Sequence, residues 1–365
     1  MEQNMLRISV KELKPNMILA KDISTKKGVV ILAKNTMLNK VNYTKLTEND
    51  IKHVYIFKDS IEDDALCFTD KAHTVEAQME PITEKAEFKS FERRYNDSLE
   101  KTKEVLSIIG DGKQLANEYL YSVTNEVINL INCKSDLLTY FGYLRESNDH
   151  TYKHSINVSL MCNLFAKWIG VNDEELKWIT IAGLLHDVGK IKIDSEILNK
   201  KGKLTDEEFE TVQKHTIYGY DLVKNMNIPD EVKKAVLMHH EKVNGTGYPN
   251  KLKGNDIGRY AKIVAICDVY EAMTSSRVYR DKYCPFKVIE EFERQSFGLL
   301  DMEYLFIFLQ NIAYTYVGSW VALNDNSIAE VMFINKSNMG RPIVKKDGEF
   351  IDLSMDTDKY IVNIV

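Results

Sequence analysis

The residues of this chain best suited to chemistry are histidines and aspartates between positions 154 and 280. Five of the eight histidines fall in this stretch, and two adjacent pairs stand out, His186-Asp187 and His239-His240. Neutral imidazoles and carboxylates together are the ligands that divalent iron, manganese and zinc accept. Any one of these histidines alone is more typical of a structural role. With Asp187 and Asp268 among them, the set predicts a metal centre.

Two metal ions held close together suit phosphoester hydrolysis, because they lower the pKa of a bridging water and stabilise the leaving oxygen. Neighbours on a helix point about 100° apart, so one helix could present His186 and Asp187 to different ions, or Asp187 as a bridge. Lys190, one turn past His186, could balance the phosphate charge. Arg277 and Arg280 are further candidates, since arginine suits bidentate contact with phosphate. For each cation the alternative is a solvated surface residue.

The segment NGTGYP, residues 244–249, follows the second histidine pair directly. Its glycines allow positive φ and a close approach of backbone to ligand. Tyr248 offers a ring and a hydroxyl, and Pro249 stiffens the end. A lone turn of this kind would mean little, but its place after metal-type histidines indicates one wall of a substrate pocket.

Composition narrows the protein class. A chain of 365 residues with 44% hydrophobic and 28% charged residues is ordinary for a globular protein of one or two domains. The net charge of −6 gives no reason to expect a nucleic-acid polymer as partner. The first ten residues lack the features of a secretory signal, and five cysteines without a CxxC motif indicate reduced thiols. We therefore expect a cytoplasmic protein without a membrane span.

The elements that must position the site are mainly helical. Short β-branched and aromatic runs near both ends predict strands, whereas helical periodicity dominates between them. The apolar stretch from Tyr304 to Leu323 carries Gln310 and Asn311 in its middle, so we expect a buried helix followed by a strand. We expect four parts: a β-rich module over 1–60, a polar linker and helical connector over 61–145, a catalytic domain over 146–318, and a β-rich extension over 319–365.

Three motifs resemble the HD-GYP phosphodiesterases, a branch of the HD metal-dependent phosphohydrolases. They are His186-Asp187 with Lys190, the run HHEKVNGTGYP from His239, and DVYEAMTSSRVYR from Asp268. The resemblance covers residues 146–318, and the GYP segment separates this branch from other HD enzymes. It implies an all-helical HD-type core with two or three divalent ions, Fe or Mn. It further implies bacterial signalling by hydrolysis of cyclic di-GMP to linear pGpG, GMP or both, through a metal-bridging hydroxide.

Carried over by position, the resemblance implies seven metal ligands: His154, His186, Asp187, His215, His239, His240 and Asp268. It implies substrate contacts from Lys190, Gly247, Tyr248, Arg277 and Arg280, with Asp187, Lys190 and Arg277 as catalytic residues. Three positions depart from the usual pattern: Asn244 and Glu271 replace aspartates, and Thr216 replaces a proline. None removes a ligand, but they leave rate and substrate preference open.

His150 is where the chain differs most from the family, whose members carry a tyrosine or a glutamate there. It precedes His154 by four residues, so on a helix both side chains lie on one face. His150 could then be an eighth ligand and hold a third ion weakly, since it replaces an anionic carboxylate. Alternatively, it sits at a helix start and only forms hydrogen bonds nearby.

Two other functions stay open at this stage. The substrate could be another cyclic dinucleotide such as cyclic GMP-AMP, because the residues that read guanine cannot be identified from sequence. The chain could also be a receptor that binds cyclic di-GMP without turnover, although an intact ligand set argues against that. A second copy of the chain or a signalling protein is a further candidate partner.

Overall fold

The structure is a computed structural model without ligands. It describes residues 5–14, 17–24, 30–32, 34, 36, 38, 42–43, 46–47, 49, 51–57, 83, 85–113, 115–131, 140, 144, 150–200, 202–275, 284–296 and 298–365. The chain divides into two compact units. One comprises Met1–Met79, Val317–Trp320 and Glu330–Met332, and the other comprises Glu80–Tyr316, Val321–Ala329 and Phe333–Val365.

The N-terminal part contains two small antiparallel sheets. β1 (Met5–Ser9) pairs with β4 (His53–Phe57), and β2 (Ile23–Ser24) pairs with β3 (Val30–Leu32). In β4 the side chains of Val54 and Ile56 alternate with exposed ones and enter a core that also holds Leu13, Leu19 and Leu46. This period of two is what a half-buried strand requires. The β-rich N-terminal segment expected from the sequence is confirmed.

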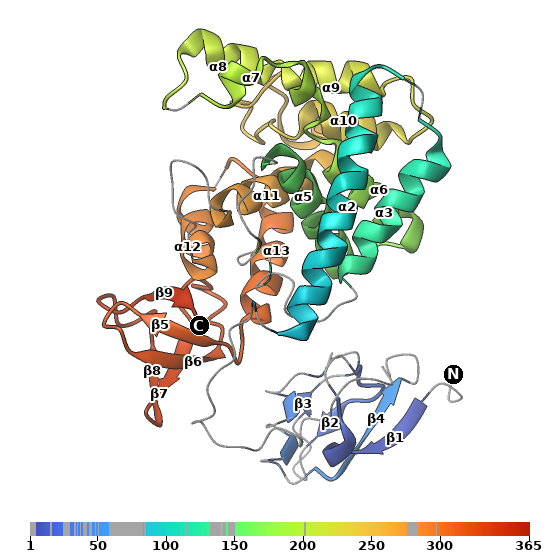
Figure 1. The fold of residues 1–365 in the computed structure, drawn as a ribbon. Helices are drawn as coiled ribbons and strands as arrows, with labels where there is room; N and C mark the ends of the chain where they lie inside the picture. Colours follow the sequence, from blue (N-terminus) through green and yellow to red (C-terminus); the bar gives the residue numbers. More distant parts are fainter. Residues whose placement is uncertain are drawn as a thin grey trace. The chain divides into compact units, whose positions relative to one another are not determined.

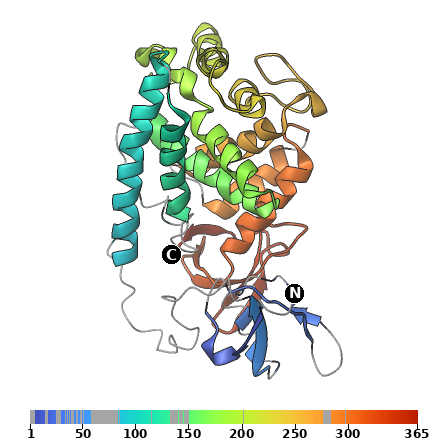
Figure 2. The ribbon, with the colours of Figure 1, turned by 90° about the vertical axis from the view of Figure 1, so that its right-hand side faces the viewer.

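The helical core carries the site. Its helices are α2 (Ala86–Gly110), α3 (Asn117–Ile131), α5 (His150–Trp168), α6 (Asp173–Leu185), η5 (Val188–Lys192), α7 (Ser195–Leu198), α8 (Asp206–Gln213), α9 (His215–Val223), α10 (Asp230–Met238), η6 (Gly254–Asp256), α11 (Arg259–Thr274), α12 (Pro285–Gln295) and α13 (Met302–Thr315). α2 and α3 lie side by side, and α5 packs against α6 and α11 at the centre (Figure 1, Figure 2). The mainly helical fold is therefore confirmed.

Local sequence signals set the limits of these helices. Asn172 caps α6 by accepting a hydrogen bond from the backbone N–H of Glu175 at 2.9 Å, as an N-cap asparagine should. Gly170, which follows α5, has a φ of 71°, a conformation that glycine adopts without steric cost. α11 is apolar on nearly every side, with Ile263 to Cys267 all buried, so it runs through the core. Its polar residues are therefore forced to find partners inside the protein.

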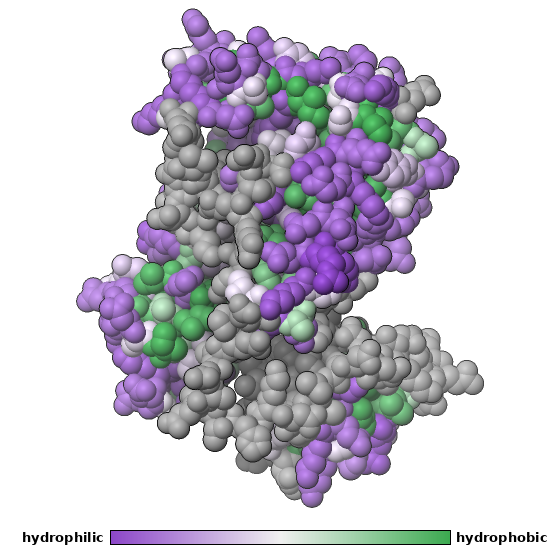
Figure 3. All heavy atoms as spheres, viewed as in Figure 1, coloured by the Kyte–Doolittle hydropathy of each residue, from purple (hydrophilic) through white to green (hydrophobic). Residues whose placement is uncertain are grey.

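The C-terminal part forms a five-stranded sheet in the order β8-β7-β6-β5-β9. The strands are β5 (Trp320–Leu323), β6 (Ile328–Phe333), β7 (Ile343–Lys346), β8 (Glu349–Asp352) and β9 (Ile361–Ile364). Asp347 and Gly348 turn β7 into β8 with φ values of 50° and 89°, as expected for an Asp-Gly hairpin. Hydrophobic side chains gather over this sheet on the face seen in Figure 3. Phe333 of β6 and Phe350 of β8 are exposed, with ring centroids 6.2 Å apart.

The apolar stretch from Tyr304 to Leu323 divides as expected into a helix, most of α13, and the strand β5. Within the described parts of the chain, no helix has the length and apolar character needed to cross a membrane.

Candidate metal centre

The predicted ligands sit mainly where helices end. His186 is the C-cap of α6, His239 is the C-cap of α10, and His215 opens α9 just after α8. The sequence led us to expect His186 and Asp187 on one helix, but α6 ends at Leu185 and Asp187 precedes the 3-10 helix η5. Because the backbone turns at this point, the two side chains can reach the same centre. His154 and Asp268 come from within α5 and α11.

Three histidines are held by the carbonyl groups of the helix ends they follow. Nδ1 of His186 lies 2.8 Å from the carbonyl oxygen of Gly183, and Nδ1 of His215 lies 2.7 Å from that of Val212. Nδ1 of His239 lies between two carbonyls of α10, at 3.0 and 3.2 Å. A carbonyl only accepts, so each Nδ1 carries the proton and donates it. In each neutral imidazole Nε2 is therefore left as a lone-pair donor for a metal ion.

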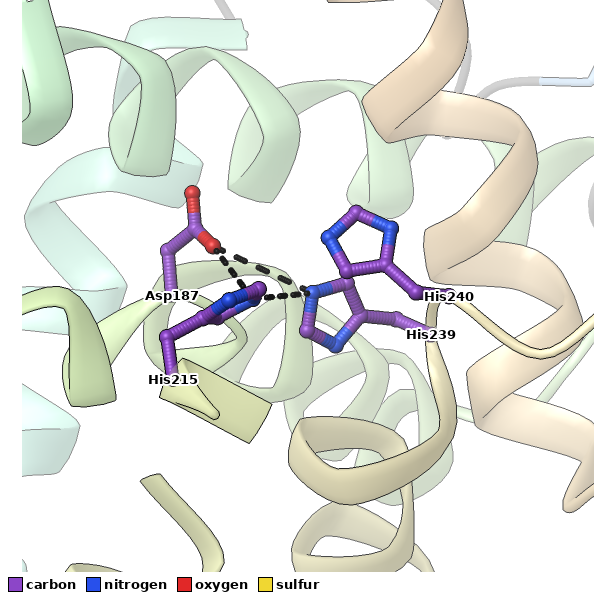
Figure 4. A group of neighbouring side chains, drawn as sticks. All are labelled: Asp187, His215, His239 and His240. Carbon is purple, nitrogen blue, oxygen red and sulfur yellow. Dashed lines mark hydrogen bonds and ion pairs between the residues drawn. The ribbon is translucent and has the colours of Figure 1, made fainter. Parts of the chain in front are cut away.

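The first ligand group contains Asp187, His215, His239 and His240 (Figure 4). Oδ1 of Asp187 lies 3.4 Å from Nε2 of His215 and 3.9 Å from Nε2 of His239. The two Nε2 atoms are 3.4 Å apart. All three side chains point toward one another in Figure 4. The ligand atoms of the four residues lie within 4.8 Å of one another, a spacing that one ion can bridge.

The second ligand group contains His154, His186 and Asp187. Oδ2 of Asp187 lies 3.3 Å from Nε2 of His186 and 3.5 Å from Nε2 of His154, and the two nitrogens are 3.2 Å apart. Asp268 joins this group, because its Oδ1 lies 3.0 Å from Nε2 of His154. Its Oδ2 lies 3.8 Å from Nδ1 of His240, which belongs to the first group. Asp187 thus directs one oxygen to each group.

The chemistry of these atoms fits a bound cation. Oδ1 of Asp187 is buried without a hydrogen-bond partner, and the Nε2 atoms of His215 and His239 that face it are acceptors in the neutral rings. Three acceptors that converge without a donor repel one another, and burying them costs free energy unless a cation lies between them. The donor set of imidazoles and carboxylates suits a divalent metal ion. The His and Asp cluster can therefore hold metal.

Burial and neighbouring charges set the protonation of the first group. Burial opposes the ionised form of Asp187, but the adjacent ammonium group of Lys190 holds the pKa of its carboxyl well below the usual range. Burial lowers the pKa of His239 well below its ordinary value and that of His240 to about 3. At neutral pH the carboxylate is therefore anionic and both imidazoles are neutral, as metal coordination requires.

The pKa of His154 is shifted in the opposite direction, upward. Burial lowers its pKa, but the carboxylates of Glu271 and Asp268 outweigh burial and raise the pKa to about 10. Oε2 of Glu271 lies 2.5 Å from Nδ1, on the side of the ring away from Asp268. The two carboxylates make this position favourable for positive charge, whether a proton on the ring or a metal ion beside it.

The segment after Asp187 brings Lys190 and the helix α9 to the centre. Nζ of Lys190 lies 2.5 Å from Oδ2 of Asp187, and the lysine side chain is 25% exposed. A Cβ atom on Gly189 would lie 1.9 Å from the carbonyl oxygen of His215, so only glycine lets η5 approach α9 so closely. This contact fixes His215 relative to Asp187, although the two are far apart in sequence.

The glycine-rich loop packs beside the first group. The ring of Tyr248 lies 4.8 Å from that of His240, between centroids, and its backbone N–H donates to the carbonyl oxygen of His240. A Cβ on Gly247 would come within 2.5 Å of the backbone around Glu241, so the loop can lie this close only with glycine there. The buried carboxylate of Glu241 accepts two backbone hydrogen bonds from the end of the loop. The loop therefore adjoins the centre, and its role as a pocket wall stays a prediction.

Three predicted site residues remain: His150, Arg277 and Arg280. His150 is the first residue of α5, its side chain is exposed, and it belongs to neither ligand group. Its ligation stays a prediction. Arg277 and Arg280 lie outside the described residues. Among the departures from the family pattern, Asn244 accepts hydrogen bonds from the backbone and hydroxyl of Thr246.

Two residues at the centre were not among the predicted site residues. Glu271 appeared in the sequence only as a departure from the family pattern, yet its carboxylate contacts His154. Its spacing of three from Asp268 on α11 was an available signal, because residues three apart share a helix face. Lys242 follows His240 by two residues and is half-buried; burial lowers the pKa of its ammonium group against the attraction of Asp268.

Comparison with known proteins finds similarity to phosphodiesterases of cyclic dinucleotides. Residues 142–303 match the HD domain family. A cyclic di-GMP phosphodiesterase of Pseudomonas aeruginosa is 32% identical over 203 residues, which are 55% of this chain and 49% of that protein. One of Thermotoga maritima is 34% identical over 178 residues, 48% of each chain. A 3′3′-cGAMP-specific phosphodiesterase of Vibrio cholerae is 33% identical over 192 residues, 50% of this chain and 37% of that protein.

A solved structure matches more of the chain. An HDG"Y"P protein from Bdellovibrio bacteriovorus superposes with a TM-score of 0.51 at 17% identity, over 84% of this chain and 98% of that one. At this identity the match supports the fold alone. The chain spans less than two thirds of the length of the three curated relatives.

Proposed function

We propose that this chain is a metal-dependent phosphodiesterase that hydrolyses cyclic di-GMP, because residues 142–303 match the HD domain family and two relatives are named cyclic di-GMP phosphodiesterases. The products would be linear pGpG, GMP or both. The observation that carries the proposal is the position of Asp187, whose two carboxylate oxygens face two separate groups of imidazoles. A shared carboxylate between two ligand groups is the arrangement that a two-metal hydrolytic centre needs.

The seven predicted ligands would be distributed between two metal ions. His215, His239 and His240 would hold one ion and His154 and His186 the other, with Asp187 shared and Asp268 beside both groups. Iron or manganese suits this set of imidazoles and carboxylates. When bound, two such ions would supply a strongly acidified water and neutralise charge on the phosphodiester. Carbonyl and carboxylate partners on Nδ1 keep the rings oriented, so little reorganisation is needed when substrate arrives.

Charged and aromatic groups around the centre would hold the substrate. Lys190 already contacts the shared carboxylate, and its partly exposed ammonium group can turn to a phosphate oxygen of the substrate. Tyr248 and Gly247 would form the wall next to His240, where the ring can contact a ribose or base. Arg277 and Arg280 are proposed as phosphate contacts from the sequence motif alone.

A second substrate class has specific support. The Vibrio relative named as specific for 3′3′-cGAMP is as similar to this chain as the relatives named for cyclic di-GMP, at 33% against 32% and 34% identity. The deciding experiment is anaerobic purification, metal analysis, and product analysis with cyclic di-GMP and 3′3′-cGAMP in parallel. If a metal-replete preparation binds the dinucleotides but cleaves neither of them, the enzymatic function is refuted and a receptor function is favoured.

Other parts of the proposal rest on sequence. A third ion at His150 is tested by metal counts for His150→Ala, which should lose that ion alone; an unchanged count would dispose of it. The four domain limits, 1–60, 61–145, 146–318 and 319–365, are proposed for limited proteolysis to test. A cytoplasmic location and a homodimer or signalling-protein partner are proposed likewise, and light scattering on the full chain tests the dimer.

A further inference from the structure

A chain of hydrogen bonds leads from the centre to α2, a helix outside the residues that match the HD domain. Nδ1 of His154 and Oε2 of Glu271 are 2.5 Å apart. Oε1 of the same carboxylate accepts hydrogen bonds from Nδ2 of Asn157 at 2.9 Å and from the hydroxyl of Ser275 at 2.5 Å. The hydroxyl of Tyr95, on α2, lies 2.8 Å from Oδ1 of Asn157 and donates to it, because the other acceptor in reach, the carbonyl oxygen of Lys153, is farther away at 3.4 Å.

We infer that Tyr95 is a positioning residue of the metal centre, acting through Asn157 and Glu271 on the imidazole of His154. The inference deepens the proposed function and rests on its metal centre, but on neither the identity of the substrate nor turnover. It assigns to α2 a part in building a site whose ligands all lie within the HD domain.

His154 differs from three other imidazoles of the centre in what orients it. His186, His215 and His239 each donate from Nδ1 to a backbone carbonyl near a helix end, which no side-chain substitution removes. Nδ1 of His154 instead contacts the carboxylate of Glu271. Since the partner on Nδ1 fixes which nitrogen faces the metal, the placement of His154 depends on how Glu271 is held.

The amide of Asn157 can hold Glu271 in only one orientation. Nδ2 must face the carboxylate, because the reverse orientation would place the amide oxygen against an anionic oxygen. Tyr95 selects the productive orientation, because its hydroxyl donates to the amide oxygen. Tyr95 is fully buried, Asn157 is 7% exposed and Glu271 is 5% exposed, so water cannot readily replace the missing donor. Losing the hydroxyl would leave a buried acceptor unsatisfied and the carboxylate less firmly placed.

The test is Tyr95→Phe in the full chain, which removes the hydroxyl and keeps the ring that packs 5.9 Å from Phe91. Manganese binding is measured without substrate, by the electron paramagnetic resonance of free Mn²⁺. We expect one class of site to bind about fivefold more weakly, the effect of one net hydrogen bond. The matched control is Tyr119→Phe. It removes a 2.5 Å hydrogen bond to Glu104 of α2 and none of the hydrogen bonds that lead from Tyr95 to His154. Its manganese affinity should equal that of the wild type.

A second background separates positioning from general stability. Glu271→Gln should weaken manganese binding by about tenfold or more, as outer partners of ligating histidines do. Adding Tyr95→Phe to it should have a smaller effect than in the wild type, because the amide of glutamine has one acceptor oxygen where the carboxylate serves His154 and Asn157 with two. Unchanged affinity in Tyr95→Phe, or equal losses in both backgrounds, would overturn the inference. If wild-type protein bound no metal, the metal centre itself would be refuted; if it bound metal without turnover, only the enzymatic part of the proposed function would fail.

Discussion

Replacing Asp187 by asparagine is the sharpest test of the two-metal centre. The substitution keeps the shape of the side chain, which is 1% exposed, and removes its negative charge. Oδ1 faces the Nε2 atoms of His215 and His239, and Oδ2 faces those of His186 and His154. Each ligand group therefore loses its shared anion. An amide also places an N–H group in one of the two groups, where it would donate to a nitrogen that should bind metal.

The expected loss of metal affinity follows from the fact that both ligand groups share Asp187. Losing an outer partner of a ligating histidine costs about 10- to 100-fold in metal affinity, so losing a direct anionic ligand should cost at least about 100-fold for each ion. If the two losses add in free energy, affinity for the pair falls about 10,000-fold. Turnover should fall at least about 1,000-fold, beyond the effect of removing one stabilising group near a developing charge.

The assay combines metal content by mass spectrometry with product analysis on cyclic di-GMP. Asp194→Asn is the matched control, because Asp194 is exposed near the end of η5 and asparagine also caps helices well. The control should keep wild-type metal content and turnover. Circular dichroism checks folding of Asp187→Asn, and we expect it to be preserved because the partly exposed Lys190 can turn to solvent. A folded Asp187→Asn protein with full metal content and turnover would refute the shared-ligand arrangement.

Lys190→Ala should keep its metal ions and lose about 100-fold in turnover, as should Arg277→Ala, because both are assigned to phosphate charge. Exposed Lys192→Ala is the control, and loss of metal in Lys190→Ala would contradict this division. Gly247→Ala should lower both Tm and turnover, because its Cβ would press on the backbone that carries the histidine pair; unchanged values of both would mean the loop can shift freely. Manganese binding near pH 7 should release about one proton, because His154 has its pKa raised to about 10 and must lose that proton to coordinate. The metal affinity should therefore weaken as pH falls, and calorimetry in two buffers that shows no proton release would contradict this assignment.

The sequence predicted the class of fold well, for physical reasons. Helical periodicity and short β-branched runs report burial directly, so the mainly helical core and the β-rich ends are confirmed. The resemblance to HD-GYP phosphodiesterases is also confirmed, since residues 142–303 match the HD domain family and relatives are named cyclic di-GMP phosphodiesterases. Adjacent His and Asp residues indicate a functional site, because such pairs are costly to bury without a partner.

What the sequence could not predict is how the side chains are oriented. The expected single helix for His186 and Asp187 was wrong, because α6 ends one residue before the pair. Helix ends depend on tertiary contacts such as that of Gly189 with the backbone of His215, which no local pattern reports. The role of Glu271 was missed for a similar reason. Its partners His154 and Asn157 are more than a hundred residues away in sequence.

The helix ends also explain why a cation, and not another set of hydrogen bonds, suits this centre. The last carbonyl groups of a helix lack partners within it and carry partial negative charge. His186 and His239 satisfy some of these carbonyls through Nδ1, and in doing so they turn Nε2 toward Asp187. Helix ends, imidazole lone pairs and carboxylates then all contribute negative potential to one buried region. Among the described residues, the ammonium group of Lys190 reaches one oxygen of Asp187 and the protonated ring of His154 lies beside Asp268, but Oδ1 of Asp187 keeps no hydrogen-bond partner. A divalent ion in each ligand group would balance this negative potential, so the same contacts that orient the histidines also favour metal binding.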